Sequence, residues 1–502
     1  MLNRTNVYYA TCVTLASIIL YLLCIRFRLI FSYSLDLDGA EFFFVNFVQL
    51  IEQGKSLYRN PLEFPFMGVQ HAPVYPYLLY SISKVLKFDL INDIHNMLVV
   101  GRFLAWISMF VNLYFISKIF RRLELPFFYS LVGATFYLLL ITGHFFATRP
   151  DGMKATLFTI FLFNTIEYMF YSGSKKYFIF SILSAVSMVL LKQDSIINIY
   201  ISLVLLCVYL QNKKAYSLFL FFSICLLISG TVCHYVFGEY FFLNIILFNL
   251  QVVTDIANSI NIWIVIFSIV RNFPLLLLAI YGSLLAIKNF KQKKIQYFIP
   301  ILSLACFVVA HVTMLRPGSY LNYTFELLLL LILNAALLVK EHEDYIFKHL
   351  KVLSVFMFIY ILSLFITNRI IHSYSFDSNQ EANHKNAYYT SLKEREQILS
   401  ITKDAVIFLP NFKYVVYYVN APFIWGYEMH FDQVLEVFLN FKIKSKLLFI
   451  STKEYDSYFT DGRVQYIITE NDKLNMDHIS KYYPRYTFYK SFNKFRMYKY
   501  AS

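Results

Sequence analysis

Charged residues are scarce in this sequence. Only 15% of its 502 residues are Asp, Glu, Lys or Arg, whereas 58% are hydrophobic and the mean hydropathy is +0.54. An ordinary soluble protein has about 25% charged residues. The chain lacks the charge to cover a water-facing surface. This excludes an ordinary soluble globular protein and makes lipid part of the solvent.

Patterned cysteines and glycines are also missing. The six cysteines lie in or beside apolar runs, none has CxxC spacing, and none follows residue 306. This arrangement argues against a disulfide framework and against a zinc site. The C-terminal part has no nucleotide-binding glycine motif. The first apolar run has no small-residue cleavage site, so we expect a retained helix and not a signal peptide.

Long apolar runs, by contrast, are abundant, and a membrane-spanning helix needs about 20 mostly apolar residues. The predicted fold class is an all-α polytopic membrane protein with about 11 transmembrane helices and a small C-terminal α/β domain outside the cytoplasm. The predicted spans are residues 8–30, 97–118, 126–147, 153–172, 176–192, 195–211, 216–236, 260–287, 295–314, 320–339 and 350–368.

The net charge of +14 would suit nucleic acid in a soluble domain. Here Lys and Arg cluster in short loops between the apolar runs, which is the pattern that orients a membrane protein. We therefore expect a lipid bilayer, and no nucleic acid, as a partner. With the N-terminus in the cytoplasm every short inside loop is basic, although Arg26 and Arg28 argue the other way. The C-terminal domain then lies outside the cytoplasm.

The transmembrane domain is predicted over residues 1–370, with a long outer loop at 31–96. Within this loop we expect two interfacial helices, at about 40–53 and 73–87. In the first helix Glu41 and Gln49 are expected on the more polar side. Residues 238–258 are apolar enough to lie along the outer leaflet.

The C-terminal domain is predicted over residues 371–502, where charged residues return. Residues 404–410, 446–452 and 464–469 have the composition of strands, and residues 431–441 that of a helix. Strand–helix–strand spacing of this kind is typical of a small α/β domain.

Three carboxylates, Asp36, Asp38 and Glu41, open the long outer loop. Carboxylates at the mouth of a membrane helix are costly unless they are solvated or used. They are therefore candidates for a general base, or for a metal and acceptor site. The alternative is structural, because Asp38 followed by Glu41 fits a capping box at the start of helix 40–53. Both interpretations stay open, since a capping Asp is also held rigidly.

Two more polar motifs lie at outer ends of spans. Arg149 and Asp151 form either a structural ion pair or part of a polar site. Lys192 is either a solvated interfacial residue or a phosphate ligand. The sequence around these residues does not decide between the alternatives.

A further polar motif precedes the span at 320–339. Arg316 suits a phosphate, because its guanidinium is always charged and bonds bidentately. Asn322 and Glu326 are one turn apart on the span and can face one cavity. His311, near another outer end, is more readily a structural histidine. All these groups gather on the outer side and none at mid-membrane depth, which favours an enzyme over a transporter.

The order of these motifs resembles the GT-C superfamily of integral-membrane glycosyltransferases. The likeness is to bacterial relatives of the protein O-mannosyltransferases and lipid A sugar transferases (glycosyltransferase family 39), and it covers most of residues 1–340. The motifs are Asp36–Glu41 after the first span, Gly54–Tyr58, His71–Pro76, Arg102 at the second span, Arg149–Asp151, and Gly318 through Asn322 and Tyr323 to Glu326.

This resemblance implies a glycosyltransferase that moves a sugar from a polyprenyl-phosphate donor to an acceptor hydroxyl at the outer face of the membrane, with inversion. The acceptor is a lipid, a glycan or a protein, and the expected location is a bacterial cytoplasmic membrane. Asp38 is the first choice for the base, followed by Glu41 and Asp36, although Gly39 replaces the second acid of the family's usual pair.

The resemblance also implies a set of substrate-binding groups, with Arg316 and Lys192 facing the phosphate. No cofactor is certain. Some members of the superfamily use a divalent metal ion, for which Asp36 and Asp38 would be the ligands here. The expected substrate-binding residues are Arg149, Asp151, Lys192, His311, Arg316, Asn322, Tyr323 and Glu326.

Two other classes fit part of the pattern. A transporter or flippase of lipid-linked glycans predicts charges within the spans and an internal repeat, and the sequence shows no convincing repeat. A polysaccharide polymerase or ligase of different fold predicts a long outer loop late in the chain, whereas the long acidic loop here is early.

Overall fold

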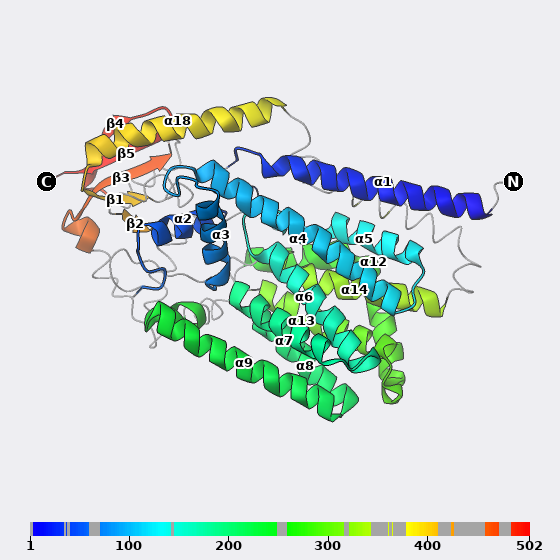
Figure 1. Cartoon of the computed structure of the whole chain (residues 1–502). Helices are drawn as coiled ribbons and strands as arrows, with labels where there is room; N and C mark the ends of the chain where they lie inside the picture. Colours follow the sequence, from blue (N-terminus) through cyan, green and yellow to red (C-terminus); the bar gives the residue numbers. More distant parts are fainter. Residues whose placement is uncertain are drawn as a thin grey trace.

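The structure of this chain is a computed structural model in which long helices form the body and a small sheet lies at one end (Figure 1). We call this end of the helix bundle the sheet end. The residues described are 4–34, 37, 41–59, 71–141, 145–247, 259–315, 321–342, 360, 364, 378–409, 423–425, 457–470 and 483–501.

Ten of the eleven predicted spans coincide with helices, and the eleventh, 350–368, lies outside the described residues apart from Tyr360 and Leu364. The π-helical turn η2 (Glu167–Tyr171) extends α6, and η4 (Phe290–Gln292) and η5 (Leu321–Thr324) are 3-10 turns. The helices are α1 (Arg4–Ile30), α4 (Ile94–Arg122), α5 (Phe127–Leu140), α6 (Asp151–Ile166), α7 (Lys175–Leu191), α8 (Ser195–Leu210), α9 (Lys213–Phe237), α12 (Ser259–Lys288), α13 (Ile295–Met314) and α14 (Phe325–Glu341).

Fewer of these helices than predicted can cross a membrane alone. Among the described residues six are long and apolar enough, namely those that contain α1, α4, α9, α12, α13 and α14. Helices α5, α7 and α8 have 14, 17 and 16 residues. At 1.5 Å per residue they fall short of a hydrocarbon core about 30 Å thick. Of the about 11 predicted spans, the described residues therefore show six by length and composition, and the others stay a prediction.

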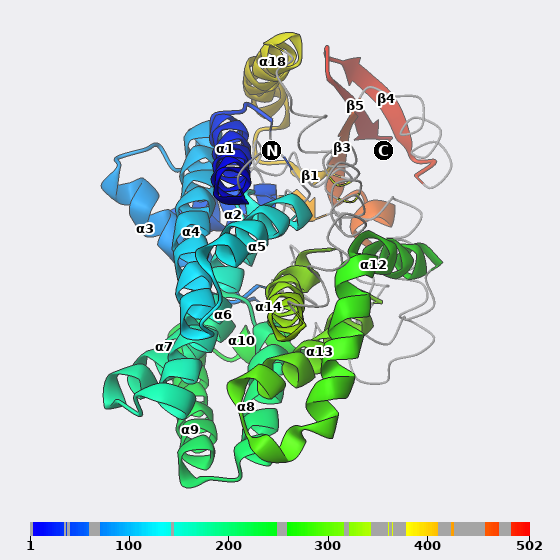
Figure 2. The same ribbon diagram turned by 90° about the vertical axis from the view of Figure 1, so that its right-hand side faces the viewer.

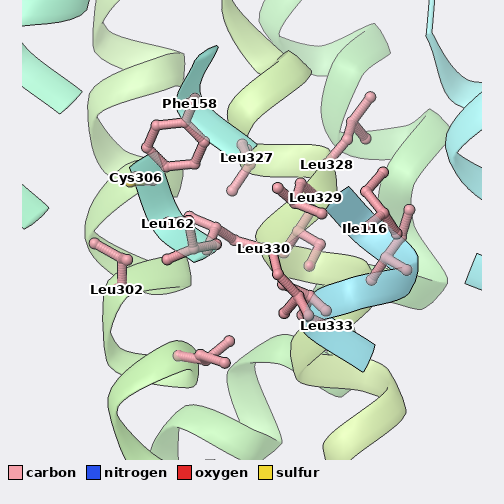
Figure 3. Close-up of a cluster of buried hydrophobic side chains, with 14 of the residues drawn as sticks. Ile116, Phe158, Leu162, Leu302, Cys306, Leu327, Leu328, Leu329, Leu330 and Leu333 are labelled. Atoms are coloured by element: carbon pink, nitrogen blue, oxygen red, sulfur yellow. The ribbon is translucent and has the colours of Figure 1, made fainter. Parts of the chain in front are cut away.

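Helix α14 forms the centre of the bundle. Residues 327–333 form an unbroken apolar run, and each of them is at most 4% exposed. A helix that is apolar all round is covered either by lipid or by protein, and here the low exposure shows that protein covers it. Figure 2 shows α14 between α5 and α6 on one side and α12 and α13 on the other. In the close-up of Figure 3, its leucines meet Ile116 of α4, Phe158 and Leu162 of α6, and Leu302 and Cys306 of α13.

The two helices predicted in the long loop are present as α2 (Glu41–Glu52) and α3 (Val74–Val85). The prediction that Glu41 and Gln49 lie on a polar side of α2 is wrong, because both residues are fully buried. The reason is that α2 belongs to a cluster of buried side chains that continues into the C-terminal domain. In the apolar segment 238–258, α10 (Tyr240–Phe242) and η3 (Leu243–Leu247) are helical, and residues 248–258 lie outside the described residues.

The C-terminal domain consists of helix α18 (Ser378–Thr402) and a five-stranded sheet in the order β2-β1-β3-β5-β4. Strand β1 is parallel to β2 and β3, whereas β5 is antiparallel to β3 and β4. The strands predicted at 404–410 and 464–469 are confirmed. The predicted strand at 446–452 and the predicted helix at 431–441 lie outside the described residues. The strands are β1 (Val406–Leu409), β2 (Phe423–Trp425), β3 (Val464–Glu470), β4 (Tyr486–Ser491) and β5 (Phe495–Tyr500).

Candidate functional site

A buried ion pair ties the start of α2 to α4. Arg102, in the third turn of α4, donates from Nε to Glu41 Oε1 at 2.9 Å and from Nη2 to Glu41 Oε2 at 2.7 Å. Both side chains are completely shielded from solvent. The Glu41 carboxylate also accepts the backbone N–H groups of Leu37, at 2.7 Å, and Thr148. A buried pair needs such extra hydrogen bonds to offset its desolvation.

The same arginine holds the chain that leaves α1. Its Nη1 donates to the Ser32 carbonyl at 2.6 Å, and its Nη2 donates to the Ser34 carbonyl at 2.7 Å. We call residues 36–40, which contain Asp36 and Asp38, the acidic segment. Ser34 precedes this segment and Glu41 follows it, and Arg102 binds both of these flanking residues. Asp36 and Asp38 themselves lie outside the described residues. We call this arrangement the Arg102 clamp.

A second group of charges surrounds Asp151, the first residue of α6. Its carboxylate accepts from Lys192 Nζ at 2.6 Å, from Asn322 Nδ2 at 2.7 Å and from Arg149 Nε at 3.0 Å. Asp151 is fully buried. The N-terminus of a helix favours a carboxylate at this position. Three segments far apart in the sequence therefore meet on one side chain.

The network continues through a lysine that our sequence analysis did not single out. Lys154 Nζ lies 3.0 Å from Glu326 Oε1 and 3.6 Å from Asp194 Oδ2, and Asp194 lies at the same distance from Lys192. The ring of Tyr323 faces both ammonium groups, at 5.6 Å from Lys154 and 4.8 Å from Lys192. A lysine one turn after Asp151 inside an apolar run is itself a signal, since a charge there requires a partner.

We call this second group the Asp151 network. It contains three cations and three carboxylates, so its formal charges cancel. Its members are Arg149, Asp151, Lys154, Lys192, Asp194, Asn322, Tyr323 and Glu326.

Residues of the long loop connect the clamp to the network. The pKa of His71 is lowered to about 3, by burial and by the nearby charges of Lys192 and Arg149. The partly buried His71 ring therefore stays neutral, and it lies 4.8 Å from the ring of Phe44 on α2. Burial raises the pKa of Tyr75 well above its usual value, and the carboxylates of Glu41 and Asp151 raise it further, against the opposing charge of Arg149.

Six of the predicted site residues with described positions therefore meet in the Asp151 network: Arg149, Asp151, Lys192, Asn322, Tyr323 and Glu326. Glu41 belongs to the Arg102 clamp. His311 does not join either group through a described contact. Its Nδ1 lies 2.8 Å from the Phe307 carbonyl of its own helix, and its ring packs on the Phe307 ring.

The remaining predicted residues are not placed. Arg316, like Asp36 and Asp38, lies outside the described residues. Within the described part of the chain, no three His, Cys, Asp or Glu side chains gather as metal ligands. The sequence candidates for a metal, Asp36 and Asp38, stay a hypothesis.

Six helices in the described part of the chain are long and apolar enough to cross a membrane, and they indicate an integral membrane protein.

Two solved structures share this fold over nearly the whole chain. ArnT from Cupriavidus metallidurans, bound to undecaprenyl phosphate, matches with a TM-score of 0.57 and 9% identity, covering 96% of this chain and 97% of ArnT. The archaeal oligosaccharyltransferase AglB from Archaeoglobus fulgidus, in complex with an inhibitory peptide and a dolichol-phosphate, matches with a TM-score of 0.52 and 9% identity. That match covers 96% of this chain and 74% of AglB. No family model and no curated protein sequence matches the chain.

Proposed function

We propose that this protein is an inverting glycosyltransferase that moves a sugar from a polyprenyl-phosphate donor to an acceptor hydroxyl at the outer face of a membrane. A carboxylate takes the proton of the hydroxyl, and the oxygen attacks the anomeric carbon. The bond from that carbon to the phosphate oxygen breaks, and the polyprenyl phosphate leaves with the bonding electrons. This reaction needs one base and cations for the leaving phosphate.

One observation carries this proposal. The charged groups predicted from the sequence gather at the sheet end of a fold that is shared with two structures, one bound to undecaprenyl phosphate and the other in complex with a dolichol-phosphate. Six charged side chains meet there within an apolar bundle. Such buried charge is expensive in a membrane protein and is retained where it serves a function.

The contacts of the clamp suggest how the acids divide their roles. Glu41 accepts two hydrogen bonds from Arg102 and two from backbone N–H groups. A carboxylate held this way is a poor base, because protonation would break the pair, so we assign it a positioning role. Asp38, which directly follows Leu37 in the chain, remains our first choice for the base, followed by Asp36.

The charge balance of the Asp151 network bears on the phosphate. Its three cations are compensated by three carboxylates, so an incoming phosphate finds no net positive charge there. An additional cation is required, and Arg316, five residues before η5, is the candidate. Lys192, which pairs with Asp151 and faces the Tyr323 ring, would then contribute to binding of the phosphate.

The test is sugar transfer by the purified full-length protein in detergent. A panel of radiolabelled undecaprenyl-phosphate sugars is offered with membrane extract as the acceptor source. We expect transfer by the wild type and a loss of at least about 100-fold in Asp38→Asn, because a general base contributes about that much. Asp404→Asn, at an exposed aspartate after α18, is the matched control.

The outcomes separate the alternatives. Transfer that survives in Asp38→Asn keeps the enzyme class and moves the base to Asp36. Lipid-linked sugar that crosses the bilayer of reconstituted vesicles without transfer favours the flippase. A wild type that transfers no sugar from any donor counts against the proposed function.

A further inference from the structure

The C-terminal domain reaches the acidic segment through one residue of α18. Glu381, in the first turn of this helix, accepts the Ser32 hydroxyl at 2.8 Å and the Tyr33 backbone N–H at 2.6 Å. A helix N-terminus favours a carboxylate there. These two partners lie 348 or more residues away in the sequence, on the stretch that joins α1 to the acidic segment.

Ser32 is therefore held from two sides. Its carbonyl accepts from Arg102 Nη1 at 2.6 Å, and its hydroxyl donates to Glu381. The ring of Tyr33, the next residue, stacks on His95 of α4 with the ring centroids 3.9 Å apart and 2° between the planes. The Lys385 ammonium of α18 lies 5.5 Å from the Tyr33 ring. Residues 32–34 are thus gripped between α4 and α18.

Helix α18 itself is anchored elsewhere. Arg395 donates to Asn92 at 2.8 Å, and Ile398 lies in the buried cluster shared with α2 and α3. Towards the sheet, the Glu394 carboxylate accepts the Lys494 N–H between β4 and β5. The C-terminal domain is therefore held on the helix bundle by contacts other than those of Glu381. Glu381 can accordingly have a different role.

We propose that Glu381 is a positioning residue for the transfer reaction, holding residues 32–34 so that the acidic segment presents its base to the acceptor. This inference rests on the proposed function. In the sequence Ser34 lies two residues before Asp36 and four before Asp38, the two residues to which the proposed function assigns the base. A misplacement of about 1 Å can lower turnover about 100-fold.

The variant that tests this role is Glu381→Gln, because its amide cannot accept from both Ser32 and Tyr33 through two oxygens. Glu396→Gln, an exposed glutamate further along α18, is the matched control. A second variant, Ser32→Ala, removes one of the two hydrogen bonds to Glu381, together with the hydrogen bond from the Ser34 N–H to the Ser32 hydroxyl at 3.2 Å, and leaves α18 unchanged. Hydrogen exchange of the Tyr33 amide, turnover with the undecaprenyl-phosphate sugar that the wild type uses, and the Kd for undecaprenyl phosphate are measured on the full-length proteins.

We expect Glu381→Gln to raise amide exchange of the peptide that contains Tyr33 at least tenfold and to lower kcat about 10- to 100-fold. Ser32→Ala should lie in between. The Kd for undecaprenyl phosphate should change less than twofold, which a general loss of structure would not allow. Glu396→Gln should match the wild type throughout.

Two results would overturn the inference. One is exchange in Glu381→Gln that equals the control, which would show that Glu381 does not hold the segment. The other is faster exchange with unchanged kcat, which would show that the grip has no bearing on transfer. If the wild type itself transfers no sugar, the proposed function fails and the positioning role fails with it, whereas the exchange data still decide whether the grip exists.

Discussion

The Arg102 clamp and the Asp151 network lie at the same end of the bundle and use buried charge in different ways. In the clamp, one arginine divides its hydrogen bonds between a carboxylate and two backbone carbonyls, so its main effect is on the path of the chain. In the network, side chains pair mostly with other side chains, and formal charges cancel. The first arrangement fixes a loop, whereas the second stores compensated charges inside an apolar bundle.

This difference predicts that the clamp is the more sensitive of the two. In Arg102→Gln, Glu41 keeps its charge in a buried site and the carbonyls of Ser32 and Ser34 lose their donor. Breaking a buried pair on one side costs about 3–5 kcal/mol. The free energy of unfolding in detergent should fall by that amount, and transfer should be lost as well.

The matched control for this variant is Arg121→Gln on the same helix, where the side chain is exposed. It should change the free energy of unfolding by less than about 0.5 kcal/mol, as is usual for a surface substitution. A fall of similar size in both variants would mean that the buried pair with Glu41 is not what stabilises this end of the molecule.

The network should tolerate loss of a pair better than loss of one partner. Lys154→Met leaves Glu326 without its cation and Asp194 with Lys192 alone, which should cost about 3 kcal/mol. Adding Glu326→Gln removes the stranded charge, so the double variant should recover about 1–2 kcal/mol. The measurement is a double-mutant cycle on the free energy of unfolding.

The control for the cycle is Lys175→Met, an exposed lysine at the start of α7. Combined with Glu326→Gln it should show additive effects, because the two side chains are not in contact. If the effects of Lys154→Met and Glu326→Gln on the free energy of unfolding are additive, these residues do not form one coupled network.

The network was largely predictable and the clamp was not. Asp151, Lys192 and Glu326 interrupt or end apolar runs, and a charge in that setting needs a partner nearby. The sequence therefore placed these residues on one side of the membrane and left open which of them pair. Lys154 carries the same signal, one turn after Asp151, but was not predicted.

The clamp depends on tertiary packing that no local pattern encodes. Glu41 and Arg102 are 61 residues apart, and their pairing requires α2 to be buried from both sides. The burial in turn comes from the C-terminal domain, whose helix α18 is highly charged and gave no apolar periodicity to read. The positions of α1, α4, α9 and α12 to α14 were readable because each is a long apolar run.

The smallest expected effect concerns His71, which lies between the two regions. Its pKa is about 3 in the folded protein and 6.5 in an unfolded chain. The unfolded state therefore binds the proton first, and the stability that the neutral ring contributes is present above pH 6.5 and declines as the pH falls towards 3. Between pH 7 and pH 5 the loss is up to about 2 kcal/mol, at 1.36 kcal/mol per pKa unit.

His71→Phe removes this titration and keeps an aromatic ring against Phe44. The free energy of unfolding of the wild type should therefore fall more between pH 7 and pH 5 than that of the variant, by up to the same 2 kcal/mol. Since other groups titrate equally in both proteins, the difference isolates this residue. Parallel pH curves would mean that the pKa of His71 is the same in the folded and unfolded states, so that neither burial nor the cations of the Asp151 network lower it.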